Sequence, residues 1–193
     1  MGSPPPLQLI ATTGSSDSDF KVVALPSLNN SGSVAFTGSL QNGTEGVWLK
    51  NGPNLSTLVD STGSFESLGG ACINDQAQLS FGAVEDGNAD VRGIYGPSGN
   101  RVIGTFNGFS KFSLPAINNN GTIATLALRS SSAENGVYLD GQAYLLNGEF
   151  VQVDISPFQA ISINDQKDLV FSAIKPDGKQ ALFLSLKDLH EED

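Results

Sequence analysis

Short apolar runs separated by polar turns recur along the whole chain at an even spacing. The first kind of run ends in an apolar-Asn pair, found at Leu28-Asn29, Ile73-Asn74, Ile117-Asn118 and Ile163-Asn164. The four asparagines lie 45, 44 and 46 residues apart. A second apolar run follows each asparagine at the same offset, at 34–36, 79–81, 123–125 and 169–171, and a third follows at 46–49, 93–96, 136–139 and 181–184. The pattern predicts four copies of one unit of about 45 residues.

Within each unit the runs are typical of antiparallel β-strands. They are short and rich in Val, Ile, Leu and aromatic residues, and turn pairs such as Asn42-Gly43 and Asp140-Gly141 separate them. We name the run before the repeated asparagine strand A and the two runs after it strands B and C. Strand D is predicted at 55–59, 101–106 and 142–146. Four meandering strands per unit match the size of a β-propeller blade.

The chain ends predict how the units close. The fourth unit has no residues left for a strand D, whereas the apolar segment 7–12 precedes the first unit without a role. We expect this segment to complete the last blade, giving an all-β, four-bladed propeller over residues 7–186. Residues 1–6 are then a leader and 187–193 a charged tail. Two alternatives stay open: an open stack of units, and a dimer whose eight units share one larger ring.

The turn between strands A and B has a local reason for its composition. Asn29-Asn30-Ser31-Gly32 contains residues that tolerate left-handed backbone, and an Asn side chain can bond the backbone two residues on. Ala77 and Lys167 replace this glycine in units two and four, so we expect a different bend or strain there.

The same residues carry a family resemblance. The run from Asn29 to Phe36 is similar to the Asn-x-x-Gly-x-x-Ala-Phe signature of bacterial tandem-repeat proteins, which are usually exported and often surface-anchored. Unit three has Thr125 in place of the phenylalanine, and units two and four lack the glycine. The resemblance concerns turn and core residues. It implies a propeller-like repeat fold and no particular activity.

Charge and composition narrow the classes of function. Ten basic against 20 acidic residues give a net charge of −10, which is unfavourable for nucleic acid binding. One Cys and one His, His190, leave no basis for a disulfide, a thiolate metal site or a His-based nucleophile. No segment is long and apolar enough to insert into a membrane. Scarce charge and many small polar residues favour a secreted, periplasmic or cell-surface protein.

The connections between strands D and A provide the main candidate site. They carry a phenylalanine in each unit and polar neighbours, and together with the B-to-C connections they form one face of a propeller. The residues predicted to bind a ligand on this face are Asp19, Phe65, Glu66, Phe109, Lys111, Asp154 and Phe158. The phenylalanines, Phe20 included, have two interpretations: an aromatic rim for an apolar or sugar-ring ligand, or packing between units. Packing is favoured because every unit has one.

Two further chemistries have weaker support. Asp86, Asn88 and Asp90 begin like a calcium loop, but Val91 and Pro97 stand where such a loop has Gly and Glu. A solvated hairpin tip is the expectation there, and no cofactor is predicted. Paired carboxylates, Glu66 with Asp154 or Glu85 with Asp90, are the candidates for acid–base chemistry.

The sequence thus predicts a non-catalytic binding or interaction module for a small molecule or a carbohydrate, as a monomer or a homodimer. The alternative is a small enzyme of lyase, cyclase or hydrolase type that uses carboxylates or Lys111 above the central channel.

Overall fold

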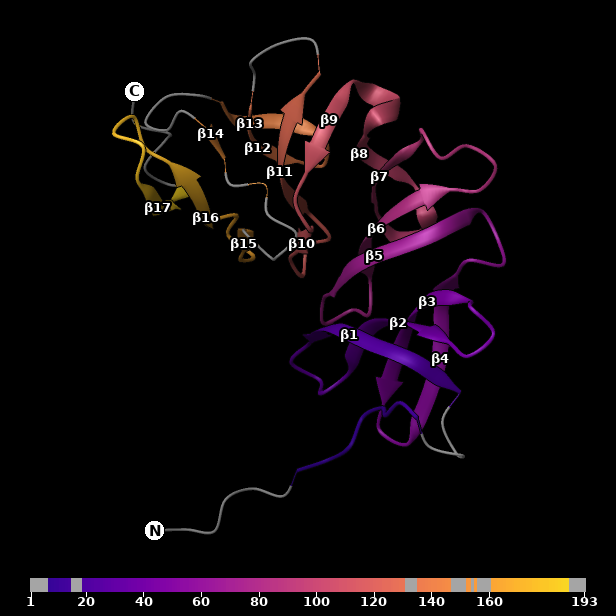
Figure 1. Ribbon diagram of the computed structural model, residues 1–193. Helices are drawn as coiled ribbons and strands as arrows, with labels where there is room; N and C mark the ends of the chain where they lie inside the picture. Colours follow the sequence, from indigo (N-terminus) through magenta and orange to yellow (C-terminus); the bar gives the residue numbers. More distant parts are fainter. Residues whose placement is uncertain are drawn as a thin grey trace, which may run out of the picture.

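A computed structural model describes residues 7–14, 19–130, 135–146, 152–153, 155 and 161–187. In these ranges the chain forms four antiparallel sheets, one for each predicted unit, which follow one another along an arc (Figure 1). The helical part within these ranges consists of two short 3-10 turns, Pro97–Gly99 and Thr105–Asn107. The all-β prediction is therefore confirmed.

The first two sheets follow the predicted strand order in full, and the last two follow it in part. The first contains β1 (Phe20–Leu28), β2 (Val34–Leu40), β3 (Glu45–Asn51) and β4 (Asn54–Asp60). The second contains β5 (Phe65–Ile73), β6 (Leu79–Glu85), β7 (Arg92–Tyr95) and β8 (Arg101–Gly104). The third contains β9 (Phe109–Phe112), β10 (Ala116–Ile117), β11 (Ile123–Arg129), β12 (Asn135–Leu139) and β13 (Gln142–Leu146). The fourth contains β14 (Gln152–Val153), β15 (Ile161–Ile163), β16 (Leu169–Ile174) and β17 (Gln180–Ser185).

The last two sheets depart from this plan at strand A. In each of them strand A is split into two pieces, β9 with β10 and β14 with β15, and both pieces pair with the same strand B. The fourth sheet ends at strand C: among the described residues β17 pairs only with β16 and no strand D follows it.

The four A-to-B turns share one backbone geometry despite their different residues. In every turn the third residue after the asparagine donates its N–H to the asparagine carbonyl, at 3.0–3.1 Å. That residue has positive φ in all four turns, +82° at Gly32, +59° at Ala77, +81° at Gly121 and +69° at Lys167. Of the two expectations for Ala77 and Lys167, strain is correct and a different bend is wrong. A side chain in this left-handed region costs roughly 1–2 kcal/mol.

The core lies between the sheets. Alternate residues of strands B and C point to opposite faces of a sheet. We call the face that packs on the following sheet the forward face and the opposite one the rear face. Val47, on the forward face of the first sheet, packs with Phe65 and Phe81 on the rear face of the second. Equivalent clusters join the second sheet to the third and the third to the fourth. The units are therefore held together by one repeated apolar contact.

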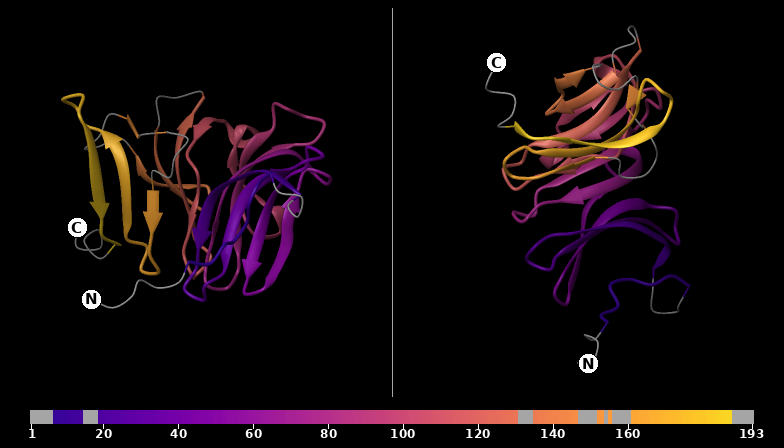
Figure 2. Two further views of the ribbon diagram at one scale, coloured as in Figure 1. Left: turned by 60° about the horizontal axis from the view of Figure 1, so that its bottom comes forward. Right: turned by 90° about the vertical axis from the view of Figure 1, so that its left-hand side faces the viewer.

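The N-terminal segment does not close a four-bladed ring. Residues 7–12 form no strand, and Ile10 and Ala11 pack on the rear face of the first sheet, against Phe20, Phe36 and Trp48. No sheet precedes this face, and Ile10 and Ala11 bury its aromatic side chains instead. The first and last sheets lie at opposite ends of an open arc (Figures 1 and 2). The prediction that this segment pairs with the last sheet of its own chain is wrong.

None of the helical turns in the described ranges has the length or apolar character of a membrane-spanning helix.

Candidate binding site

The predicted phenylalanines are core residues where the structure describes them. Phe20, Phe65 and Phe109 are 7%, 7% and 1% exposed. Each packs edge-on against the aromatic side chain of strand C in its own sheet, with ring centroids 4.9 Å apart for Phe20–Trp48, 4.8 Å for Phe65–Tyr95 and 4.8 Å for Phe109–Tyr138. Packing between units is confirmed for Phe65 and Phe109. Phe20 is also a packing residue, but it lies on the rear face of the first sheet, under Ile10 and Ala11 and not between two units. An aromatic rim is not formed by these three residues.

The polar residues of the predicted face lie apart from these rings on the surface. Asp19, Glu66 and Lys111 are exposed, and the Asp19 carbonyl accepts a hydrogen bond from the backbone N–H of Gln41 at 2.8 Å. Asp154 and Phe158 lie outside the described residues. Ligand binding at Glu66 and Lys111 stays a prediction.

The carboxylate of Glu85 is used within its own sheet. It accepts hydrogen bonds from Arg101 Nε at 2.6 Å and from the Tyr95 hydroxyl at 3.1 Å. The Arg101 guanidinium holds the pKa of Glu85 below its usual range, while burial and this carboxylate raise the pKa of Tyr95 to about 12. Glu85 is therefore ionised at neutral pH and suited to an ion pair rather than to proton transfer.

The loop after Glu85 is a tight hairpin. Asn88 donates its N–H to the Glu85 carbonyl, and Val91 donates to the Asn88 carbonyl at 2.8 Å. In the part of the chain that the structure describes, no three His, Cys, Asp or Glu side chains gather into a group that could hold a metal ion. The calcium loop of Asp86, Asn88 and Asp90 gains no support from this geometry.

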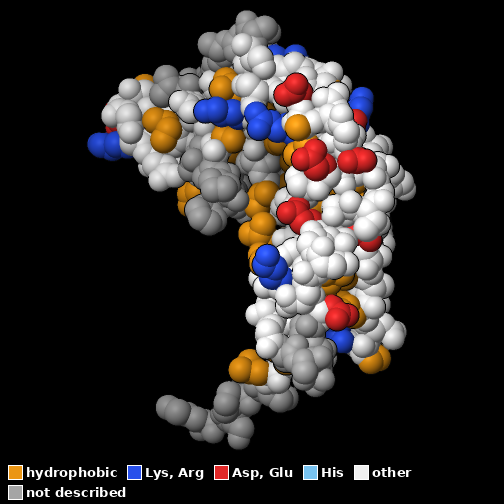
Figure 3. Space-filling model, turned by 45° about the vertical axis from the view of Figure 1, so that its right-hand side comes forward, with side chains coloured by type: hydrophobic (Ala, Val, Ile, Leu, Met, Phe, Trp, Pro, Cys, Tyr) orange, Lys and Arg blue, Asp and Glu red, His pale blue; other side chains and the backbone are white. Residues whose placement is uncertain are grey.

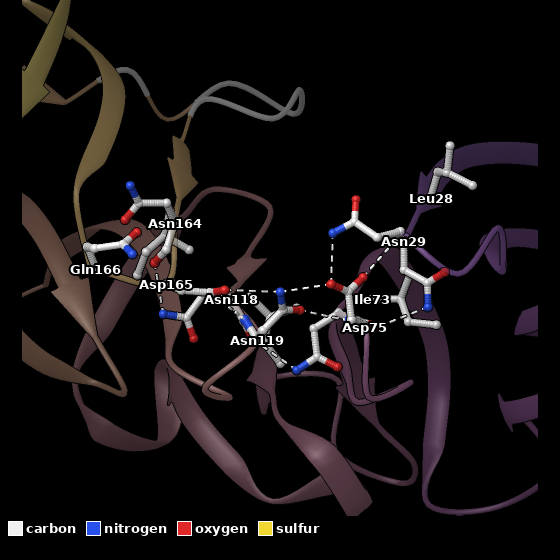
Figure 4. Close-up of a pocket in the computed structure, with 13 residues that line it drawn as sticks. Leu28, Asn29, Ile73, Asp75, Asn118, Asn119, Asn164, Asp165 and Gln166 are labelled. Atoms are coloured by element: carbon white, nitrogen blue, oxygen red, sulfur yellow. Dashed lines mark hydrogen bonds between the residues drawn. The ribbon is translucent and has the colours of Figure 1, made fainter.

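A polar pocket lies instead at the A-to-B turns. Its volume is about 330 Å³, and residues 28–30, 73–75, 117–119 and 163–166 line it (Figure 4). Each unit thus contributes its apolar-Asn pair and the residue after it. We call this the Asn/Asp pocket. In an antiparallel meander the A-to-B turns lie at the opposite end of the sheets from the D-to-A connections, so this pocket is not on the predicted face.

An amide ladder crosses the pocket from unit to unit. The repeated asparagine donates Nδ2–H to the carbonyl of the next one, from Asn29 to Asn74 at 3.1 Å, from Asn74 to Asn118 at 2.9 Å and from Asn118 to Asn164 at 2.9 Å. The Oδ1 atom of each accepts N–H groups of its own turn. The asparagine therefore shapes its turn with one end of the side chain and binds the neighbouring unit with the other.

A second ladder runs through the residue after each asparagine. The Asn30 N–H donates to Asp75 Oδ1, the Asp75 N–H to Asn119 Oδ1 and the Asn119 N–H to Asp165 Oδ1, at 2.7–2.8 Å. Amides alternate with carboxylates along this row, so that Asn30 and Asn119 both donate Nδ2–H to Asp75 Oδ2. We call the two rows together the Asn/Asp ladder.

The ladder favours the ionised form of Asp75. Hydrogen bonds from the Asn30 backbone, and then from its side chain, lower the pKa of Asp75, because they favour the ionised carboxylate. Asp75 therefore contributes to stability while it is ionised, above the ordinary pKa of an aspartate. That contribution is lost as the pH falls through its lowered pKa.

Sequence reasoning used the repeated asparagines to find the units but assigned them no binding role. Their spacing places them at one turn in every unit. The signal that was missed is the alternation of Asn30, Asp75, Asn119 and Asp165 at the next position. No protein-family model matches this chain, and no curated protein matches it either.

Proposed function

We propose that this protein is a non-catalytic binding module and that the Asn/Asp pocket receives a hydroxyl-rich small molecule of the carbohydrate class. The observation that carries the proposal is the pocket lining, in which four successive turns present amides and carboxylates around one hollow. Such groups donate to and accept from hydroxyl groups. A volume of about 330 Å³ lies within the roughly 300–1,000 Å³ of small-molecule pockets.

The chemistry of the lining favours binding over catalysis. A general acid or base works best with a pKa near the operating pH, whereas hydrogen bonds lower the pKa of Asp75. Gln166 supplies an exposed amide beside the ladder, and Leu28 supplies apolar surface that is 70% exposed. Apolar surface beside polar groups suits a sugar ring, which has both kinds of face. The low content of charged residues and the many small polar ones favour an exported location for such a module.

The test is a carbohydrate array followed by calorimetry with the saccharide that binds best. Gln166→Ala is expected to weaken binding by about tenfold, the value of one good hydrogen bond with its shape contact. Gln76→Ala is the matched control, since Gln76 occupies the same position of unit two, is exposed, and does not line the pocket.

Variants on the predicted loop face separate the two locations. Glu66→Ala and Lys111→Ala should leave the affinity unchanged. Loss of binding in these two variants alone would move the site to the D-to-A face. Conversion of the bound saccharide to a product by the wild-type chain would contradict a non-catalytic module.

A further inference from the structure

The forward face of the last sheet is built like an interior contact but lies on the surface. At the equivalent position of strand C, Val47, Ile94 and Val137 are 0%, 1% and 0% exposed, because the following sheet covers them. Leu182 of β17 takes this position in the fourth sheet and is 78% exposed. Leu184 and its cross-strand partner Val170 on the same face are 65% and 43% exposed. In the other three units, a further copy of the same unit covers this face.

The Asn/Asp ladder is also open at its two ends. Among the described residues, the Nδ2 group of Asn164 donates to Asp168 of its own turn, not to a following unit. At the other end, no asparagine side chain within the described ranges donates to the carbonyl of Asn29. The ends are complementary: the fourth unit ends on the carboxylate of Asp165, and the first begins on the amide of Asn30. Alternation of amide and carboxylate would continue without a break if Asp165 met Asn30.

The start of the arc offers the matching surface. The rear face of the first sheet carries Phe20, Phe36 and Trp48 with Ile10 and Ala11 over them. Leu9, which precedes Ile10 in the chain, is 74% exposed. Segment 7–12 thus lies where a preceding sheet would lie. The sheet that would precede it in a ring, the fourth, has no strand D among the described residues.

We propose that two copies of this chain join head to tail into a closed ring of eight sheets. The forward face of the fourth sheet of each copy packs on the rear face of the first sheet of the other, so that the same contact forms twice. Leu182 and Leu184 of one copy meet segment 7–12 of the other, which occupies the place of the missing strand D. The Asn/Asp ladder then runs unbroken around the ring.

Three observations point to a second copy as the occupant. In the first three sheets, the forward face packs on the rear face of another sheet of the same kind. The ladder ends match each other in donors and acceptors. The four sheets also leave one side of the arc open, and the space-filling view shows the molecule as a crescent with a hollow beside it (Figure 3). Contacts between unlike surfaces close into a ring or grow into a filament, and two matched arcs close with two contacts.

The experiment measures the mass of the full chain in solution by sedimentation over a wide range of concentration. The expected result is a species of twice 20.1 kDa with no larger assemblies at high concentration. Leu182→Asp and Leu9→Asp should each weaken the dimer by at least about 100-fold, roughly tenfold for each of the two contacts. Both side chains are largely exposed in one chain, so both variants should unfold at the same denaturant concentration as the wild-type monomer.

Leu146→Asp is the matched control. Leu146 is 42% exposed on β13 of the third sheet, away from both ends of the arc, and its substitution should leave the dimer intact.

Mixing the two variants identifies the head-to-tail arrangement. A pair made of one Leu182→Asp chain and one Leu9→Asp chain carries both changes at one contact and none at the other. The mixture should therefore dimerise more strongly than either variant alone. Four outcomes would overturn the proposal: a monomer at every concentration, growth into larger polymers, a dimer that tolerates both variants, or a mixture no stronger than its parts.

Discussion

The two ends of this array of sheets are built differently. At the start, the aromatic rear face of the first sheet is covered by Ile10 and Ala11, so that Phe36 and Trp48 are each only 4% exposed. At the end, the forward face of the fourth sheet leaves Leu182 and Leu184 largely exposed. Repeat proteins need a polar or covered face on their terminal units. The difference teaches that the last unit has the residues of an interior unit.

The largest expected difference in unfolding free energy is between substitutions at two equivalent positions of strand C. Ile94→Ala should destabilise the chain by about 2–5 kcal/mol, because it leaves a cavity between the second and third sheets. Leu182→Ala at the same position of the last unit should cost less than about 0.5 kcal/mol in the monomer, as a surface substitution does. Urea unfolding of both variants in a Leu9→Asp background, which keeps the chain monomeric, measures the two values. Similar costs for the two would mean that the last face is covered within one chain.

A smaller effect separates the middle of the ladder from its end. Asn74 is 3% exposed, shapes its turn and donates to Asn118, whereas the exposed side chain of Asn164 forms hydrogen bonds only within its own turn among the described residues. Asn74→Ala should cost about 2–3 kcal/mol because it leaves buried groups without partners. Asn164→Ala should cost about 1 kcal/mol or less in the monomer. Thermal unfolding of the two variants checks the order, and a reversed order would contradict the role of the ladder between units.

The smallest effect has the opposite sign. Ser80 lies on the forward face of the second sheet, 0% exposed, and its hydroxyl has no hydrogen-bond partner among the described residues. The equivalent residues of the first and third sheets are Ala35 and Ala124. Ser80→Ala should stabilise the chain by about 1 kcal/mol, since burying an unpaired hydroxyl costs roughly that much. Denaturant unfolding measures the gain. A loss of stability would show that this hydroxyl has a partner.

Much of the fold followed from sequence spacing. The four antiparallel sheets, strands B and C of each and the lack of a strand D in the last, among the described residues, were predicted, because alternating apolar residues and turn pairs are local signals. Strain at Ala77 and Lys167 was one of two expectations. The turn keeps its left-handed geometry there because its backbone hydrogen bonds outweigh the strain of a side chain. The split of strand A into β9 with β10, and β14 with β15, left no such signal.

The candidate site was less predictable. The phenylalanines of the D-to-A connections attracted attention because they recur, yet Phe65 and Phe109 recur for packing. The Asn/Asp pocket forms where four turns from distant parts of the chain come together, and only the arc brings Asp75 within 2.7 Å of the Asn30 backbone.

The sequence by itself determined that this is an all-β protein with four antiparallel sheets, because strand and turn preferences depend on residues a few positions apart. The tertiary structure alone decided where segment 7–12 lies, and it placed the pocket at the A-to-B turns. Both placements depend on contacts between distant parts of the chain: the burial of an apolar sheet face by segment 7–12 and hydrogen bonds between residues about 45 positions apart. No local pattern reports such contacts.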